Sequence, residues 1–285
     1  MRGHKTLASF LVAAVLLGGC ANAPQALTLK SGDKYVAMGS SFAAGPGIPD
    51  YYEEPVRPCA RSNNNYAHQV AKRRGLTLVD VSCSGATTLH LTGPRDAIPP
   101  QIEAVDANTR LVTITIGGND LGYMTKLFAA SCFGLAQQSQ ASTAGCSAVP
   151  AAPTEQAYAE LAARMDAVAK DVRRRAPNAR LVFVDYLTVL PAQGDCPAAP
   201  LSVSEADASR EIARRLAIIT AKAARDNGAD LIESSKLSDS HSVCAAEPWM
   251  NGYPRPDAPI AGTGYHPNAA GMTAIADALE KMLWP

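Results

Sequence analysis

Residues 111–120 read Leu-Val-Thr-Ile-Thr-Ile-Gly-Gly-Asn-Asp. The first six are apolar or β-branched, with no glycine or proline among them, which is typical of a strand that is buried on both faces. The last four, Gly117 to Asp120, favour a turn and end the strand. Strands of this kind occur in parallel sheets with helices on both sides, where ligands bind beyond the carboxyl ends of the strands. We therefore expect an α/β fold with a site near Asn119.

Four further short apolar runs have the same character: Lys34–Met38, Leu76–Val81, Arg180–Tyr186 and Ala229–Glu233. Apolar spacing and capping residues indicate helices between and after them: Asn63–Arg74 with Asn63 as its N-cap, Ala157–Arg175, Glu205–Asn227, and a last helix that begins at Asn268. This alternation predicts a three-layer α/β/α, flavodoxin-like fold with a parallel sheet of about five strands. We expect loop-rich stretches at 121–153, 187–203 and 235–265.

The N-terminus has the features of an export signal, which would occupy residues 1–20. Basic residues precede an apolar run, Leu7–Leu17, that is too short to span a bilayer. The run ends in Leu17-Gly18-Gly19-Cys20, which resembles a bacterial lipobox. We therefore expect Cys20 to be lipidated and to anchor the protein to a membrane of the cell envelope. Plain secretion, with cleavage after Ala21-Asn22-Ala23, is the alternative.

The rest of the chain is expected to comprise a tether, 21–33, and a single domain, 34–285, because no internal repeat or linker divides it. Lysine plus arginine and aspartate plus glutamate both number 26 among 285 residues, so the formal net charge is zero. This balance gives no sign of a nucleic-acid partner. We expect a monomer.

The cysteines agree with export. Apart from Cys20, six remain, an even number, and an exported chain meets an oxidising compartment, so three disulfides are expected. Spacing alone does not choose between the pairings. Our working prediction joins neighbours along the chain: Cys59–Cys83, Cys132–Cys146 and Cys196–Cys244. The sequence has no C-x-x-C pair and no cluster of cysteine with histidine, so no zinc site is expected.

Four short motifs contain candidate catalytic residues, and each lies in or near a predicted loop. Ser41 follows the first strand in Gly39-Ser40-Ser41, Gly85 follows the second in Ser84-Gly85-Ala86-Thr87-Thr88, and Asn119 follows the third. His266 lies in Gly264-Tyr265-His266-Pro267-Asn268, where Pro267 keeps it extended before the last helix. Taken singly, each motif is as well explained by a turn, a helix cap or a surface histidine.

Taken together and in this order, the motifs resemble the conserved blocks of the SGNH (GDSL-like) hydrolase superfamily, in particular the secreted, disulfide-bonded esterases and lipases of actinobacteria. The resemblance runs from about Tyr35 to the last helix. It implies a serine ester hydrolase that cleaves small esters or lipids through an acyl-enzyme, without a metal or cofactor. It also implies that Ser41 is the nucleophile and His266 the general base. The N–H groups of Ser41 and Gly85 and the Asn119 side chain would form the oxyanion hole.

Two positions depart from the family pattern. Ser40 stands where the first block has an aspartate, which is not expected to take part in the chemistry. Thr263 stands three residues before the histidine, where the family usually has an aspartate that orients the imidazole. We therefore expect a Ser-His dyad in which the backbone carbonyl of Thr263 or Gly264 accepts the Nδ1 hydrogen bond. Asp257, in the same loop, is the alternative partner.

Two other functions fit the same residues. With a sugar or lipid hydroxyl in place of water, the machinery would serve an acyltransferase, and a deacylase acting on envelope lipid or glycan would also use it. An inactive, lipid-anchored binding protein could keep the fold as well, although the complete set of serine, glycine, asparagine and histidine argues against it. A further choice concerns Tyr123, Met124, Leu127 and Phe128, which would line an acyl pocket or form the apolar face of a short core helix.

Overall fold

The computed structural model describes residues 28–50, 59–257 and 259–285. Within them a parallel sheet has five strands in the order β2-β1-β3-β4-β5. The strands are β1 (Lys34–Gly39), β2 (Thr77–Asp80), β3 (Thr109–Thr115), β4 (Arg180–Val184) and β5 (Asp230–Ile232). Each begins and ends within two residues of its expected position. This order, which starts inside the sheet and proceeds outward to both edges, is the flavodoxin-like one.

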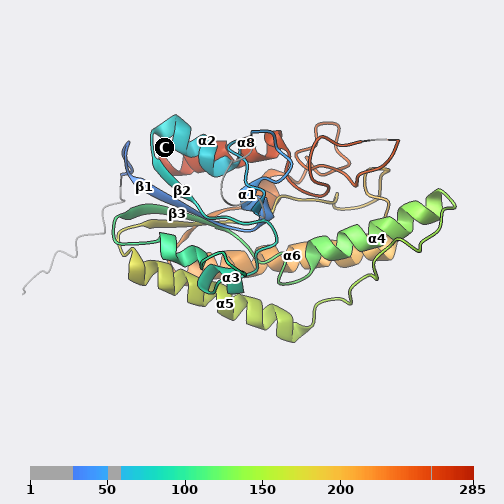
Figure 1. Cartoon of the computed structure of the whole chain (residues 1–285), viewed down its shortest axis with the longest axis horizontal. Helices are drawn as coiled ribbons and strands as arrows, with labels where there is room; N and C mark the ends of the chain where they lie inside the picture. The colour runs from blue at the N-terminus through green and yellow to red at the C-terminus, as the bar shows by residue number, and fades with distance from the viewer. Residues whose placement is uncertain (1–27, 51–58, 258) are drawn as a thin grey trace, which may run out of the picture.

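Helices cover both faces of the sheet. In Figure 1, α2 (Tyr66–Arg74) and α8 (Ala269–Leu283) lie above it, and α5 (Glu155–Arg175) and α6 (Val203–Asp226) lie below it. The central strands β1 and β3 are therefore buried on both sides, as their apolar sequences require. The structure confirms the expected three-layer α/β/α architecture.

The long helices begin where the sequence supplies a cap. The side chains of Thr154, Ser202 and Asn268 each accept a hydrogen bond from the backbone N–H three residues further on, at 3.0–3.3 Å. Such a bond satisfies one of the N–H groups that a helix leaves free at its start. On α5 the apolar stripe from Leu161 to Val172 is buried, and the opposite face is polar.

The expected N-cap at Asn63 was wrong by two residues. Helix α2 begins at Tyr66, and Asn65 caps it by accepting the His68 N–H at 3.0 Å. Asn63 instead donates from its backbone N–H and its side chain to Asp50. Three asparagines in succession offer the same capping chemistry, so the tertiary contact with Asp50 decides which of them caps the helix.

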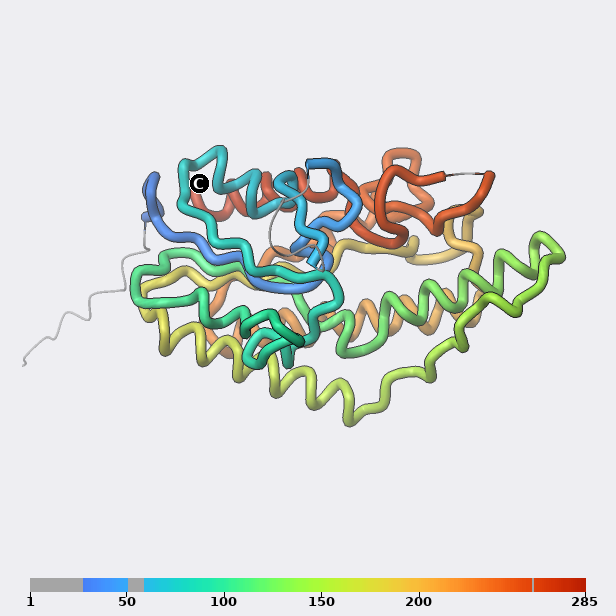
Figure 2. Tube along the Cα trace, viewed as in Figure 1, coloured from blue at the N-terminus to red at the C-terminus, as the bar shows by residue number. Residues whose placement is uncertain are grey.

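The expected loop-rich stretch 121–153 was also wrong in part, because it contains helix α4 (Tyr123–Gln138). Figures 1 and 2 show α4 running past the end of the sheet. Tyr123, Met124 and Leu127 are buried in the hydrophobic core. Of the two alternatives for this segment, the core helix is the one that the structure has.

Four shorter helical elements complete the described chain. They are α1 (Ser41–Ala44), α3 (Leu89–Thr92), the 3₁₀ helix η2 (Gln101–Ala104) and α7 (Ser234–Leu237). In the chain, α1, α3 and α7 come after β1, β2 and β5, and η2 comes before β3. Helix α1, directly after β1, is the one that bears on the candidate site.

Three disulfides join Cys59 to Cys83, Cys132 to Cys146, and Cys196 to Cys244. These are the pairs of neighbours along the chain that our working prediction joined. The Cys132–Cys146 bridge ties α4 to the segment after it, and the Cys196–Cys244 bridge joins the loops that follow β4 and β5.

The expected signal segment, its lipobox with Cys20, and residues 21–27 of the expected tether lie outside the described residues. Among the helices of the part that is described, none combines the length and the apolar character needed to cross a membrane. Most of the buried apolar residues in the described part of the chain belong to one contiguous core.

Candidate active site

The candidate site lies where the strand order of the sheet reverses. Strand β1 has β2 on one side and β3 on the other, and the chain proceeds from β3 outward through β4 and β5. Ligands bind at such switch points in open α/β sheets, beyond the carboxyl ends of the strands. Ser41 follows β1 and Asn119 follows β3, so the fold places both residues at this point.

Ser41 is held at the end of β1 by bonds to the backbone before it. The Gln101 side chain accepts the Gly39 N–H at 2.7 Å and donates to the Gly39 carbonyl at 3.0 Å. The Ser40 N–H donates to the Thr115 carbonyl on β3 at 2.9 Å. Ser41 is then the first residue of α1, so its own N–H is one of the groups that a helix leaves free at its N-terminus.

His266 lies against Ser41. Its Nε2 is 2.8 Å from Ser41 Oγ, and its Nδ1 is 2.7 Å from the Gly264 carbonyl oxygen. A carbonyl can only accept, so Nδ1 carries the proton and Nε2 is free to accept the Ser41 hydroxyl hydrogen. Burial lowers the pKa of His266 below its ordinary value of 6.5, and the hydrogen bond to Gly264 opposes that shift. The histidine is therefore neutral near neutral pH, as a general base must be.

The loop that carries His266 is fastened to the preceding segment. The Asn251 N–H donates to the His266 carbonyl at 2.9 Å, and the Tyr265 N–H donates to the Asn251 carbonyl at the same distance. Tyr265 has a φ of 54°, which is unusual for a bulky residue. Its ring is fully buried and its hydroxyl forms a 2.5 Å hydrogen bond with Ser131 of α4. These contacts hold the strained backbone next to His266.

Gly264 has no room for a side chain. A Cβ there would lie 2.8 Å from Pro254 Cδ, 3.1 Å from the Gly252 oxygen and 3.2 Å from Phe128 Cε1. The backbone that supplies the carbonyl for His266 is therefore packed directly against two other segments. Phe128, one of the residues considered for an acyl pocket, forms part of this packing and has its ring centroid 5.5 Å from that of Tyr265.

Of the groups considered for orienting His266, the structure brings only the Gly264 carbonyl to the ring. The Thr263 carbonyl accepts from the Asn251 side chain at 3.1 Å and from the His266 backbone N–H at 3.3 Å. Asp257 forms a two-pronged ion pair with Arg255, and its side chain is 67% exposed. The Asp257 carboxylate therefore points to a partner in its own loop.

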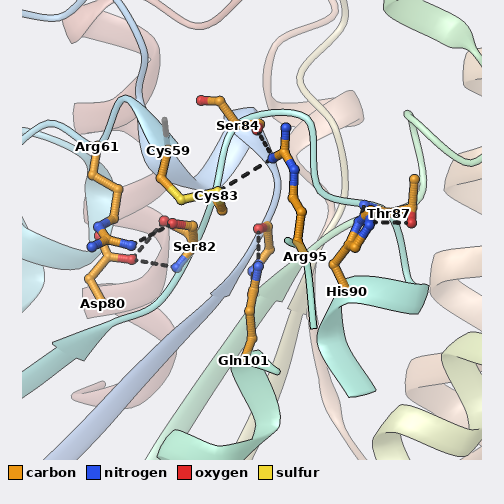
Figure 3. Close-up of a disulfide and its surroundings, with 11 residues drawn as sticks. Cys59, Arg61, Asp80, Ser82, Cys83, Ser84, Thr87, His90, Arg95 and Gln101 are labelled. Atoms are coloured by element: carbon orange, nitrogen blue, oxygen red, sulfur yellow. Dashed lines mark hydrogen bonds between the residues drawn. A yellow bond between two sulfur atoms is a disulfide. The ribbon is translucent and has the colours of Figure 1, made fainter. Parts of the chain in front are cut away.

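Gly85 lies in the loop after β2, which Figure 3 shows with its disulfide. The Cys83 N–H donates to the Gly39 carbonyl at 3.0 Å, which joins this loop to the end of β1. Gly85 has a φ of 82°, and a Cβ there would lie 3.0 Å from Arg95 Nη2. Arg95 also donates to the Ser84 carbonyl, directly before Gly85. The backbone conformation therefore favours glycine, and the guanidinium leaves little room for a Cβ.

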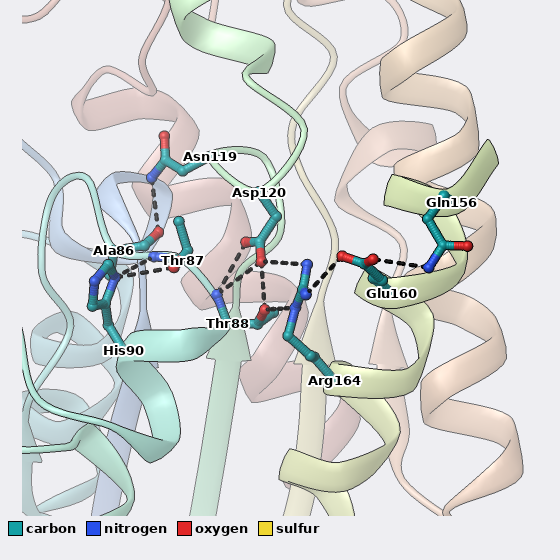
Figure 4. A network of polar contacts seen from close by, with 9 residues as sticks. All are labelled: Ala86, Thr87, Thr88, His90, Asn119, Asp120, Gln156, Glu160 and Arg164. Carbon is teal, nitrogen blue, oxygen red and sulfur yellow. Dashed lines mark hydrogen bonds and ion pairs between the residues drawn. The ribbon is translucent and has the colours of Figure 1, made fainter. Parts of the chain in front are cut away.

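Asn119 faces the same loop from the end of β3. Its Nδ2 donates to the Ala86 carbonyl at 2.8 Å, as Figure 4 shows. This bond fixes the orientation of the amide and uses one of its two N–H groups. This bond joins the third motif to the second at Ala86, the residue directly after Gly85.

Tyr186 is a site residue that the sequence did not single out. Its hydroxyl accepts the Gly118 N–H at 3.1 Å and forms a 2.7 Å hydrogen bond with Ser40 Oγ. It therefore connects the residue before Ser41 with the residue before Asn119. Burial raises the pKa of Tyr186 to about 12, so the hydroxyl keeps its proton. Ser40 stands where the family pattern has aspartate, and it bonds to this tyrosine. The one hint of this role in the sequence is the position of Tyr186 at the end of the predicted strand 180–186.

The arrangement can stabilise a negative oxygen next to Ser41. Within the residues that the structure describes, the N–H groups of Ser41 and Gly85 donate to no protein acceptor, and Asn119 retains a second amide N–H. Preorganised donors of this kind stabilise the oxyanion of a tetrahedral intermediate. A hydroxyl, a neutral imidazole and spare donors together are the groups that acyl transfer requires.

Comparison with known proteins agrees with this chemistry. The model of the GDSL-like Lipase/Acylhydrolase family matches residues 37–274. Lipase 2 of Streptomyces coelicolor is 32% identical over 268 residues, which cover 85% of this chain and 83% of that protein.

Two solved structures are similar over most of their length. Phospholipase A1 from Streptomyces albidoflavus has a TM-score of 0.70 and 26% identity, covering 88% of this chain and 99% of that one. The extracellular lipase from Streptomyces rimosus has a TM-score of 0.66 and 26% identity, covering 87% of this chain and 98% of that one. The chain therefore belongs to the GDSL-like lipase/acylhydrolase family, among the SGNH hydrolases of the actinobacterial type, and is a carboxylic ester hydrolase.

Proposed function

We propose that Ser41 is the nucleophile of this ester hydrolase and that His266 is its general base, held by a backbone carbonyl in place of an acid. The observation that carries the proposal is the continuous chain of hydrogen bonds from Ser41 Oγ through the imidazole to the Gly264 oxygen, at 2.8 and 2.7 Å. A serine hydroxyl becomes a useful nucleophile only when a base in this position removes its proton.

The reaction has two halves. Ser41 Oγ attacks the ester carbonyl carbon while its proton passes to His266 Nε2, and the tetrahedral intermediate then expels the alcohol, which takes that proton. The acyl group is now an ester of Ser41. Water attacks it with His266 again as the base, and collapse of the second intermediate releases the acid and returns the proton to Ser41.

The oxyanion of each intermediate would be bound by the N–H groups of Ser41 and Gly85 and by the Asn119 amide. Their lack of another acceptor within the described chain supports this role for the two backbone groups. The loss of one such donor typically lowers the rate about 10²–10³-fold. Asn119 is the donor that mutation can remove without altering the backbone.

The test is turnover of a soluble p-nitrophenyl ester by Ser41→Ala and His266→Ala variants whose folding is checked by circular dichroism. We expect each to lose at least ~10⁴-fold in kcat. Ser204→Ala, an exposed serine near the start of α6, is the matched control and should retain full activity. Turnover by folded Ser41→Ala at the wild-type rate would contradict the proposal. Product analysis with an added alcohol acceptor distinguishes hydrolysis from acyl transfer.

We further propose that the enzyme is exported and acts as a monomer on lipid-like esters, with Cys20 as its lipid anchor. The names of the relatives support a lipid substrate: one is a lipase and one a phospholipase A1, and the lipase from Streptomyces rimosus is an extracellular protein. The lipobox-like sequence before Cys20 supports the anchor.

The anchor is tested on the full-length chain expressed in an actinobacterial host. We expect the wild type in the detergent phase of a Triton X-114 extraction and the Cys20→Ala variant outside it. Equal partition of both variants into the aqueous phase would favour plain secretion. Light scattering of the released enzyme tests the monomer.

A further inference from the structure

A buried polar network lies behind the proposed oxyanion hole (Figure 4). The Thr88 backbone N–H donates to both carboxylate oxygens of Asp120, at 3.0 and 3.2 Å, and the Thr88 hydroxyl donates to the same carboxylate. Arg164 of α5 donates from Nε to the Thr88 hydroxyl oxygen at 2.9 Å and places Nη2 3.6 Å from Asp120 Oδ1. The Asp120 side chain is only 1% exposed.

This network joins the two loops that carry two of the proposed donors. Thr88 is three residues after Gly85, and Asp120 directly follows Asn119. The Asn119 amide already donates to the Ala86 carbonyl in the opposite loop at 2.8 Å. Two sets of hydrogen bonds therefore connect the loops. One joins Asp120 to Thr88, and the other joins Asn119 to Ala86.

The charges explain why the network is stable only as a whole. A buried carboxylate without a partner is costly, whereas a hydrogen-bonded and paired one is tolerated. Thr88 supplies two hydrogen bonds, and Arg164 supplies the compensating positive charge from a helix of the outer layer. Arg164 is 30% exposed and also pairs with Glu160 on its own helix, so it ties both loops to α5.

We propose that Asp120, backed by Arg164, is a positioning residue that sets the spacing between the Gly85 and Asn119 donors. The inference rests on the proposed catalytic roles of those two residues. Asp120 itself would touch neither the substrate nor the reacting oxygen, because its carboxylate is directed at Thr88 and Arg164. Its effect on the reaction would pass through the geometry of the two loops.

This role has a kinetic signature. The donors act on charge that develops in the transition state, so their displacement lowers kcat and leaves ground-state binding, and thus KM, nearly unchanged. Displacement of reacting groups by about 1 Å can cost about 10²-fold in rate. We expect Asp120→Asn to lower kcat about 10- to 100-fold on a soluble p-nitrophenyl ester, with KM within about 3-fold of wild type.

Two further positions separate positioning from a general loss of structure. Thr88→Val removes the hydroxyl and should resemble Asp120→Asn, whereas Thr88→Ser keeps it and should restore kcat to within about 3-fold of wild type. Arg164→Met removes the positive charge without substituting a residue of either loop, and it should also lower kcat. Asp166→Asn is the control for Asp120→Asn. It makes the same chemical change on α5, at a carboxylate that pairs with Lys170, and it should leave kcat unchanged.

The decisive measurement is a double-mutant cycle with Asn119→Ala, followed by single-turnover acylation of the folded variants. If Asp120 acts through the position of Asn119, Asp120→Asn should cost less than about 3-fold in the Asn119→Ala background. The same factor in both backgrounds, or wild-type kcat in Asp120→Asn, would overturn the inference. If Asp120→Asn does not fold, the cycle is run with Arg164→Met, and the same outcomes decide. Failure of the proposed function would appear separately, as turnover by Ser41→Ala.

Discussion

The carbonyl oxygen of Gly264 lies 2.7 Å from Nδ1 of His266, in the place where a Ser-His-Asp triad has a carboxylate. A carbonyl fixes the same tautomer but brings no negative charge to the imidazole. Nothing at Nδ1 therefore raises the basicity of His266 as strongly as an acid would, and burial lowers its pKa. In the proposed dyad, the imidazole of His266 would therefore be neutral at every pH above its lowered pKa.

The pH dependence of kcat/KM should reflect this neutral base. If His266 is the base, as proposed, the reaction requires its unprotonated form, so activity should fall as pH falls through its pKa in the free enzyme. Because burial lowers that pKa below 6.5, the midpoint of the acid limb should lie below 6.5. A pH-stat assay of a simple ester from about pH 4 to pH 9 measures it. Samples held in acid and assayed at neutral pH control for unfolding; a midpoint above 6.5 would contradict the account.

Gly264→Ala should impair catalysis through the position of His266. The added methyl group would meet Pro254, Gly252 and Phe128 at 2.8–3.2 Å, so the backbone that carries the carbonyl or the groups packed against it must shift. We expect kcat to fall by about 10²-fold. Gly145→Ala is the control, since a Cβ there meets nothing within 4 Å and the backbone is not in the left-handed region. Equal activity of both variants would show that this packing does not position His266.

Tyr186→Phe should lower kcat by about 10-fold, because it removes the hydroxyl that joins Ser40 to the Gly118 N–H. Tyr35→Phe is the matched control. The Tyr35 hydroxyl is also buried and forms a 2.8 Å hydrogen bond, but its partner is Thr113 within strand β3 and not a residue next to Ser41 or Asn119. Both variants should lose some thermal stability, and only Tyr186→Phe should lose activity. Steady-state kinetics and melting temperatures of the pair test this.

The fold could be predicted from the sequence because its central strands are runs of apolar and β-branched residues, such as 111–116, without glycine or proline. Such runs are typical of a sheet covered on both faces. Helix α4 was expected only as one alternative for its first residues, and its full length was not predicted. Tyr123–Gln138 is apolar around much of its surface, so its sequence shows little helical periodicity. The N-cap at Asn65 was missed because Asn63 and Asn64 offer the same local chemistry.

The candidate site divides in the same way. Ser41, Gly85, Asn119 and His266 lie in short motifs at strand ends and before a helix, and the sequence contains that signal. Tyr186 contacts Ser40, 146 residues away along the chain, and Arg164 contacts Thr88, 76 residues away. No local sequence pattern marks either residue. The carbonyl of Gly264, and not that of Thr263, accepts the hydrogen bond from Nδ1 of His266. The Thr263 carbonyl already accepts from the Asn251 side chain, a tertiary contact that the local sequence does not reveal.

Asp185 should make stability depend on pH in an unusual direction. Burial raises its pKa from 3.8 to about 6, so the native state binds the proton more tightly than the unfolded chain. Its contribution is fully present below pH 3.8 and is lost as pH rises to about 6. Asp185→Asn removes this dependence. The free energy of unfolding of the variant, relative to wild type, should increase by about 2–3 kcal/mol between about pH 4 and pH 7.

Urea unfolding at the two pH values measures this difference. The hydrogen bonds that Ser235 donates to Asp185 favour the ionised carboxyl group and partly oppose the effect of burial, so the measured difference is the net of the two. A difference that does not change with pH would show that Asp185 is ionised in the folded protein as easily as in the unfolded chain.

The central claim is that Ser41 forms the covalent intermediate, and peptide mass spectrometry after treatment with a fluorophosphonate tests it most directly. Ser40 is the control, because it is adjacent, also buried, and bonded to Tyr186 instead of His266. The account predicts one phosphonyl adduct on Ser41 in the wild type and in Ser40→Ala, and none in Ser41→Ala. An adduct on another residue, or labelling that persists in Ser41→Ala, would contradict it.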